Sequence, residues 1–190
     1  MNVSHSHTGN PKYLLVFSLL VLILTVSLDQ VTKNIITSTI PLGQSIPTTG
    51  LFRLTHVTNT GSAFGLFTNQ TTLLTFASIL GIGVLLLFHY SHQIRTIFVH
   101  VCLGLQLGGA VGNLCDRIIL GHVIDFIDVG IWPVFNIADS AIVIGLLGLM
   151  LTLIFSKSKK EGVQVCEEET SVVQRIVQIS QESDEKRSHE

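Results

Sequence analysis

The sequence predicts an all-α membrane protein with four transmembrane helices and a small β-sheet or interfacial segment between the first and second helices. Composition carries most of this prediction, because 47% of the residues are hydrophobic, only 13% are charged, and the mean hydropathy is +0.56. Such a chain is too apolar for an ordinary soluble domain. In addition, four apolar runs have about the 17 to 25 residues that a spanning helix needs: Tyr13–Leu28, Leu73–Tyr90, Ile94–Leu114 and Ile137–Phe155.

The first apolar run could be a cleavable secretory signal, because it is N-terminal and follows Lys12. No small-x-small cleavage site follows it, however, so we expect it to be retained as a span. Asp29 and Lys33 come next, at positions i and i+4 with the acid first, which is the favourable order on a helix. They could be a snorkelled ion pair that ends the span. A functional role would require that they face the other acidic residues.

The segment from Gln30 to Thr72 contains the expected sheet. Prolines and glycines punctuate it, and Leu51–Val57 partly alternates as a strand would. Directly after this stretch, Asn59–Phe67 mixes small residues with aromatic ones, which suits backbone that approaches something closely. It could be a cover over a lipid-facing site, or simply a re-entry turn at the membrane interface.

The third run carries small residues suited to close helix packing: Gly104, Gly108, Gly109, Ala110 and Gly112. Asn113 and Arg117 then bring an amide and a guanidinium to its outer end. These groups could hold nearby carboxylates in place and bias their ionisation. Asp116 could instead pair with Arg117, which would make that pair structural.

Asp125 and Asp139 flank the start of the fourth run. Asn136 could be the N-cap of this helix, with Asp139 in its first turn, and this alone would explain Asp139 without catalysis. It would not explain Asp125, which lies in a very apolar segment and needs a partner. Two adjacent carboxylates share a proton, so that one activates water while the other polarises a peptide carbonyl, as in aspartic proteases.

The basic residues predict the topology. With a cytoplasmic N-terminus, four spans place Arg95 and the lysines from Lys157 to Lys160 inside, as the positive-inside rule expects. Every acid within residues 1–160 then falls on the outer side: Asp29, Asp116, Asp125, Asp128 and Asp139. The outer face is therefore where we expect the chemistry.

Two other classes of function compete with acid–base catalysis. A proton-coupled transporter or channel subunit would also contain intramembrane carboxylates, but it would need them deep in several spans. A metal-binding protein could use His89, His92 and His100, which this topology puts on the cytoplasmic side. We interpret these as interfacial histidines. The cysteines Cys102, Cys115 and Cys166 predict neither a disulfide framework nor a thiolate metal site, and we expect no cofactor.

Taken together, several blocks resemble the lipoprotein signal peptidase family, signal peptidase II. They occur in family order on a chain with four predicted spans, and the resemblance covers about residues 13–156. The blocks are Asp29-Gln30-Val31-Thr32-Lys33, Asn59-Thr60-Gly61-Ser62-Ala63-Phe64-Gly65, Gly109-Ala110-Val111-Gly112-Asn113-Leu114-Cys115-Asp116-Arg117, Val123-Ile124-Asp125-Phe126 and Phe135-Asn136-Ile137-Ala138-Asp139-Ser140.

The resemblance implies a membrane aspartic endopeptidase of the bacterial inner membrane. Such enzymes remove the signal peptide of prolipoproteins just before a cysteine that carries diacylglycerol, and globomycin-type cyclic peptides inhibit them. It implies that Asp125 and Asp139 are the catalytic dyad at the periplasmic interface. By the same motifs, the residues that line or support the site are Asn59, Asn113, Arg117, Asn136, Asp29 and Lys33.

The expected domain organisation follows from these assignments. Residues 1–12 would be a flexible cytoplasmic leader, residues 13–156 a four-helix transmembrane peptidase domain, and residues 157–190 a charged cytoplasmic tail. The expected partners are diacylglyceryl-prolipoprotein substrates and membrane lipids, with no nucleic acid. A weak apolar recurrence between Val172 and Ile179 could make part of the tail a surface helix that binds a partner.

Overall fold

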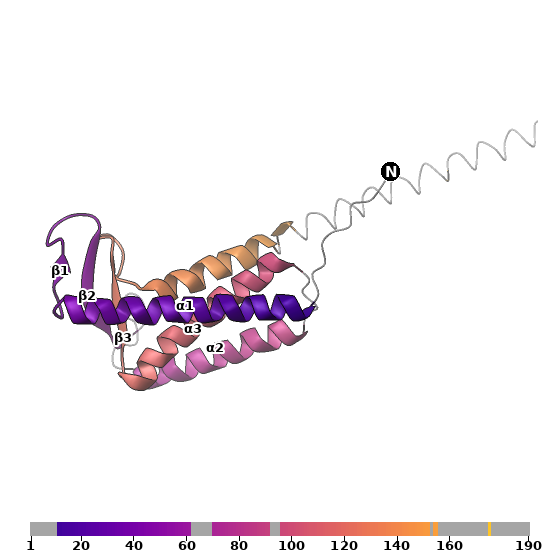
Figure 1. Ribbon diagram of the computed structural model, residues 1–190, viewed down its shortest axis with the longest axis horizontal. Coiled ribbons are helices and arrows are strands. Elements are labelled where there is room, and N and C mark those ends of the chain that lie inside the picture. The colour runs from indigo at the N-terminus through magenta and orange to yellow at the C-terminus, as the bar shows by residue number, and fades with distance from the viewer. Residues whose placement is uncertain (1–10, 62–69, 92–95, 153, 156–174, 176–190) are drawn as a thin grey trace, which may run out of the picture. The chain divides into compact units, whose positions relative to one another are not determined.

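The computed structural model describes residues 11–61, 70–91, 96–152, 154–155 and 175 (Figure 1). The chain divides into two units, Met1–Leu149 and Met150–Glu190. In the second unit the described residues are helical. The expected leader, apart from its last two residues, and the expected tail, apart from Arg175, lie outside the described residues.

The apolar runs form helices. These are α1 (Pro11–Thr39), α2 (Thr71–Ser91), α3 (Ile97–Ile119) and a final helix, Ile137–Thr152. The first three contain stretches long and apolar enough to cross a membrane, whereas the final helix is shorter over its described residues. Most of the large apolar side chains on these helices are exposed at the surface, where lipid replaces water. The structure is thus a largely helical membrane fold, and three of the four predicted spans have the length to cross the bilayer.

Two helices extend well past their predicted ends. The first was expected to end at Leu28 and the third at Leu114, but α1 continues to Thr39 and α3 to Ile119. The polar residues in these extensions, such as Lys33 and Asp116, are buried against one another, so they do not end the helices. The predicted apolar runs marked the extent of the spans, and the structure shows that both helices continue beyond them.

Helix α3 packs closely against both α1 and the final helix. A Cβ atom at Gly108 would lie 2.7 Å from the Cβ of Thr25 on α1, and one at Gly109 would overlap the carbonyl oxygen of Ala138 on the final helix. Glycine is therefore required on two sides of α3, and the predicted packing role of these small residues is confirmed. Helix α2, by contrast, has no buried residue between Thr71 and Phe88.

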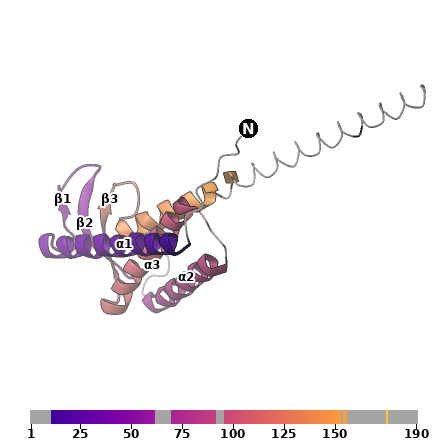
Figure 2. The ribbon, with the colours of Figure 1, turned by 45° about the vertical axis from the view of Figure 1, so that its right-hand side comes forward.

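A three-stranded antiparallel sheet lies at the C-terminal end of α1 (Figures 1 and 2). Its order is β1 (Ser45–Ile46), β2 (Arg53–Asn59) and β3 (Val123–Asp128). The first two strands fall in the segment where a sheet was expected. The third follows α3, so the expectation of a sheet built only between the first two helices was incomplete.

A small apolar core fixes the sheet to α1. Ile36 on the last turn of α1 and Ile40 directly after that helix pack with Phe126 of β3, and Ile137 packs against this cluster. The buried His56 of β2 adds a polar contact, since its Nδ1 lies 2.8 Å from the carbonyl oxygen of Ile40. The same strand that carries Asp125 is therefore anchored on the end of α1.

Candidate active site

Strand β3 carries Asp125 on a defined face of the sheet. Side chains alternate between the two faces of a strand, and the register pairs Val57 with Asp125 and Asn59 with Val123, so these residues share a face. The Nδ2 of Asn59 accordingly donates a hydrogen bond of 2.9 Å to Oδ2 of Asp125. The Asp125 side chain is buried, with 2% of the residue exposed.

Asp139 lies in the first turn of the final helix, where it forms a capping box with Asn136. The backbone N–H of Asp139 donates to Oδ1 of Asn136 at 2.9 Å, and the N–H of Asn136 donates to Oδ2 of Asp139 at 3.3 Å. This reciprocal pattern satisfies two backbone donors at the helix start. The predicted cap is confirmed, and Asp139 remains half-buried rather than enclosed.

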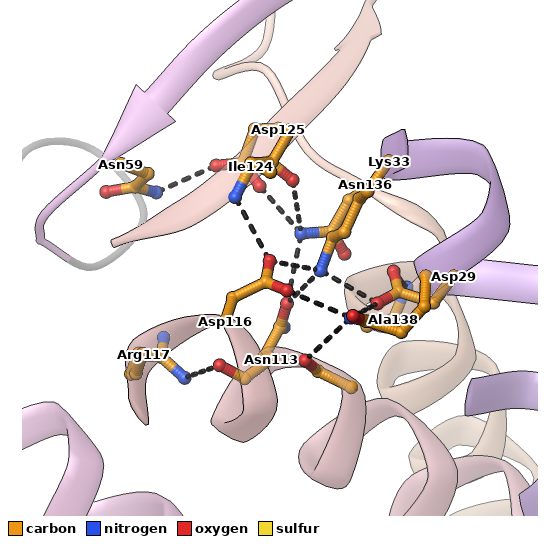
Figure 3. Close-up of polar contacts among 12 residues, drawn as sticks. Asp29, Lys33, Asn59, Asn113, Asp116, Arg117, Ile124, Asp125, Asn136 and Ala138 are labelled. Atoms are coloured by element: carbon orange, nitrogen blue, oxygen red, sulfur yellow. Dashed lines mark hydrogen bonds and ion pairs between the residues drawn. The ribbon is translucent and has the colours of Figure 1, made fainter. Parts of the chain in front are cut away.

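Two amides connect the two carboxyl groups, and Figure 3 labels both amides, Asn113 and Asn136, together with Asp125. The Nδ2 of Asn136 lies 2.7 Å from Oδ1 of Asp125 and 3.1 Å from Oδ1 of Asn113. The Nδ2 of Asn113 in turn donates to Oδ1 of Asp139 at 2.8 Å. Asp125 and Asp139 are thus brought together as expected, and the groups that link them are neutral.

Burial sets the ionisation of Asp125. Removal from solvent, with the nearby charge of Asp139, raises the pKa of the Asp125 carboxyl to about 6, although the hydrogen bonds from Asn59 and Asn136 and the charge of Lys33 oppose the rise. A carboxyl group with such a pKa exchanges its proton near neutral pH, which an acid–base catalyst must do.

Asp29 and Lys33 form a second cluster beside the first. The Nζ of Lys33 lies 2.8 Å from Oδ2 of Asp29, 2.8 Å from Oδ2 of Asp116 and 3.1 Å from Oδ1 of Asn113. All three charged side chains are buried, so the interpretation of a snorkelled pair at the end of the first span is wrong. The cluster meets the aspartate pair through Asn113.

Asp29 also supports the final helix directly. Its Oδ1 accepts a hydrogen bond of 3.0 Å from the backbone N–H of Ala138, in the first turn of that helix. A Cβ atom at Gly112 would lie 2.7 Å from Oδ2 of Asp29, so only glycine lets this carboxylate reach its position.

Asp116 and Gln30 belong to this cluster and were not predicted as site residues. Asp116 accepts from Gln30 Nε2 at 2.9 Å and from the backbone N–H of Ile124 at 3.2 Å, which attaches β3 to α3 next to Asp125. The spacing of Asn113 and Asp116, at i and i+3, puts both on one face of a helix and could have indicated this contact.

Asp116 binds Lys33 and not Arg117. The alternative in which Asp116 and Arg117 form a structural ion pair is therefore wrong. The Nη1 of Arg117 lies 3.2 Å from Oγ of Ser78 on α2 and 3.5 Å from the carbonyl oxygen of Asn113. No ion pair joins it to either aspartate of the pair among the described residues. Arg117 therefore lies near the site and links α3 to α2.

Other expectations fall partly outside the described residues. In the Asn59–Phe67 segment the described part ends at Gly61, whose N–H donates to Oδ1 of Asn59 at 2.9 Å. His92 is not described, whereas His100 is buried in α3, and its level in the membrane stays a prediction. The described part of the chain contains no group of three or more His, Cys, Asp or Glu residues that could hold a metal ion. Cys102 and Cys115 are free thiols.

Comparison with known proteins gives one consistent result. Residues 21–155 match a family model described as Signal peptidase (SPase) II. A lipoprotein signal peptidase of Dehalococcoides mccartyi is 44% identical over 133 residues, covering 67% of this chain and 82% of the relative. One of Moorella thermoacetica is 41% identical over 138 residues, covering 72% and 91%.

A solved structure agrees with these matches. It is titled as a bacterial membrane enzyme structure determined by the in meso method at 2.3 Å resolution, and it aligns with a TM-score of 0.71 at 34% identity. The alignment covers 75% of this chain and 90% of that one. Fold, site and comparisons together define an integral membrane protease. The chain belongs to the signal peptidase II family.

Proposed function

We propose that the chain is an aspartic endopeptidase that removes the signal peptide from diacylglyceryl-modified prolipoproteins, cutting just before the lipid-modified cysteine. One observation carries the chemistry: Asp125 and Asp139 are linked through Asn113 and Asn136, with no cation in hydrogen-bond contact among the described residues. Relatives named lipoprotein signal peptidases support the choice of substrate.

The environments of the two acids suggest different roles. Asp125 is buried on β3 and holds its proton at higher pH than an ordinary carboxyl, so we assign it the protonated state. Burial opposes ionisation of Asp139 as well, but this residue lies at a helix N-terminus and accepts hydrogen bonds from Asn113 and from the Asn136 backbone, which favour the charged form. Asp139 is then the base that activates water, while Asp125 polarises the scissile carbonyl.

The proposed reaction needs only these two groups and water. Asp139 takes a proton from water as the oxygen attacks the peptide carbonyl carbon, and Asp125 gives its proton to the carbonyl oxygen. The tetrahedral intermediate then collapses: the C–N bond breaks, the proton on Asp139 passes to the leaving nitrogen, and the hydroxyl proton returns to Asp125. One water is consumed, and both carboxyl groups recover their starting states.

The position of the site suits a lipid-modified substrate. The acyl chains of such a substrate remain in the bilayer, so the adjacent peptide bond is presented at the membrane boundary. Asp139 starts the final apolar helix, and Asp125 lies in the sheet at the end of α1. A substrate whose acyl chains stay in the bilayer would therefore present its adjacent peptide bond at the level of Asp125 and Asp139.

The proposal extends to location and organisation. We propose a bacterial inner-membrane protein in which Ile137–Thr152 belongs to the fourth span, both termini are cytoplasmic, and the aspartates face the periplasm. Residues 13–156 would form the peptidase domain, flanked by a leader at 1–12 and a tail at 157–190. Globomycin-type peptides would inhibit it by occupying the aspartate pair.

A cleavage assay with a diacylglyceryl-modified prolipoprotein in detergent or vesicles tests the chemistry. Asp125→Asn and Asp139→Asn are each expected to lower kcat by about 100-fold or more, because each removes one partner in proton transfer. Asp128→Asn is the matched control. It changes a buried carboxylate on the same strand that binds Arg53 and Thr55 instead, and it should retain most of the activity.

Near-normal turnover by either dyad variant, in folded and membrane-inserted form, would refute the assignment. The same substrate with serine in place of the lipid-carrying cysteine tests specificity, since it cannot receive the lipid. We expect it to be cut poorly. Efficient cleavage of this substrate would indicate a general protease rather than a lipoprotein-processing one.

A further inference from the structure

Two loops at one end of the sheet expose large apolar side chains. The loop before β2 presents Leu51 and Phe52, which are 74% and 76% exposed, and the loop after β3 presents Ile131 and Trp132, which are 92% and 57% exposed. We call these four residues the apolar tip. Exposed apolar groups of this size, gathered outside the spanning helices, indicate a contact surface.

The sheet register brings the two loops together. Arg53 at the start of β2 pairs with Asp128 at the end of β3, so the residue before Arg53 and the residue after Asp128 leave the sheet at the same end. A Cβ atom at Gly130 would lie 3.9 Å from the carbonyl oxygen of Leu51, which confirms that the loops are neighbours. The tip is therefore a single surface.

No charge within the tip opposes its transfer from water. The loop residues 47–52 and 129–132 contain no ionisable side chain. The nearest charges, on Arg53 and Asp128, form an ion pair of 2.7 Å, and the N–H of Gly130 occupies the other oxygen of Asp128 at 2.8 Å. Water or a polar partner is not needed to neutralise these groups.

The direction of the strands fits a membrane surface. Figures 1 and 2 both show β2 running across the axis of α1 at the C-terminal end of that helix. Because α1 crosses the bilayer, strands perpendicular to it run along the surface, and the loops at their end stay near the level of the headgroups. Tryptophan is one of the side chains that favour this zone.

We propose that the apolar tip inserts into the interfacial layer of the bilayer and anchors the sheet there. The partner is the boundary between headgroups and acyl chains, and binding requires no particular headgroup charge. The anchor lies at one end of β3 and Asp125 in the middle of the same strand. Insertion would thus hold the catalytic carboxyl at a fixed depth relative to the lipid.

Trp132 allows a direct test, because it is the only tryptophan in the chain. The full chain is reconstituted into phosphatidylcholine vesicles whose acyl chains carry bromine either near the headgroup or near the chain end. We expect blue-shifted Trp132 emission and stronger quenching by the shallow bromine than by the deep one. Added anionic lipid or raised salt should leave the quenching unchanged, since the tip is uncharged.

Matched variants assign the effect to the tip. Phe52→Ser and Ile131→Ser should shift Trp132 emission to longer wavelength and lower its quenching by lipid, whereas Ile131→Leu should not. Wild-type emission quenched by aqueous iodide and not by brominated lipid would overturn the proposal, because the tip would then lie in water. Lipid quenching that appears only when the chain is diluted in the bilayer would also overturn it, since the tip would then contact a second copy.

Discussion

Four carboxyl groups at the site form two pairs that are built in opposite ways. Asp29 and Asp116 share the ammonium of Lys33, at 2.8 Å from each. Asp125 and Asp139 are linked only by amides. The two pairs lie next to each other and are joined through Asn113, yet only one of them includes a cation.

The presence or absence of a cation indicates which pair has a structural role and which pair can transfer protons. A carboxylate in contact with a buried cation is held ionised, and exchanging its proton would break the pair. Carboxyl groups held only by amides can keep or release a proton at small cost. The pair with Lys33 therefore suits a structural role, and the pair without a cation suits proton transfer.

Removing the cation should produce the largest change in stability. Lys33→Met leaves Asp29 and Asp116 buried without compensation, at a cost of about 3 to 5 kcal/mol. The thermal unfolding midpoint in detergent measures this loss. Lys12→Met, the same substitution at an exposed position on the same helix, should change stability by less than about 0.5 kcal/mol. Equal effects of the two substitutions would contradict the structural role of Lys33.

Breaking the amide link should act on catalysis more than on stability. Asn136→Ala removes the hydrogen bond to Asp125 and the cap on Asp139, so the two acids lose their mutual alignment. We expect kcat/KM to fall by about 100-fold and stability to fall by about 1 kcal/mol. Ser140→Ala is the control, because Ser140 bonds only the backbone oxygen of Asn136 among these residues. A small loss of activity with a large loss of stability in Asn136→Ala would contradict this prediction, because Asn136 would then have mainly a structural role.

The pH profile of kcat/KM should report the proton on Asp125. With a pKa of about 6, the protonated form is lost as the pH rises through that value, so activity should decline on this side. The hydrogen bond from Asn59 favours the ionised form. Asn59→Leu should therefore raise the pKa and move the decline upward by about one pH unit. Thr58→Val, on the opposite face of β2, should leave the profile in place, and a downward shift in Asn59→Leu would exclude the assigned role.

The smallest effect is expected where an ion pair reaches the surface. Arg53 is partly exposed, and its Nη2 and Nε lie 2.7 and 2.9 Å from Oδ2 of Asp128. Arg53→Met should cost about 1 kcal/mol or less. Comparing the stability losses of Arg53→Met and Lys33→Met shows how strongly burial of the cation matters. A larger loss in Arg53→Met than in Lys33→Met would contradict this prediction.

Much of the fold was accessible from the sequence, because membrane spans are encoded by length and apolarity. The close packing of α3 and the cap at Asn136 followed from residue type and local spacing. The ends of α1 and α3 did not. Lys33 and Asp116 look like residues that leave the membrane, but they are buried in contact with each other, and both helices continue past them.

The site was predicted as a set of residues but not as an arrangement. That Asp125 lies on a strand depends on pairing between β2 and β3, which are separated by two helices, and local pattern does not encode such a distant register. Likewise, the burial of Asp29 depends on the absence of a side chain at Gly112 on another helix.

The Asn136 side chain both caps the final helix and binds Asp125, and one orientation of its amide makes both contacts. Its oxygen starts the final helix and its nitrogen holds Asp125, so both contacts require the amide to point the same way. A reversed amide would set a nitrogen against the N–H of Asp139 and an oxygen against a carboxyl group. Aspartate at this position would keep the helix start while adding a negative charge beside the acids. The beginning of a helix thus fixes which end of the Asn136 amide faces Asp125.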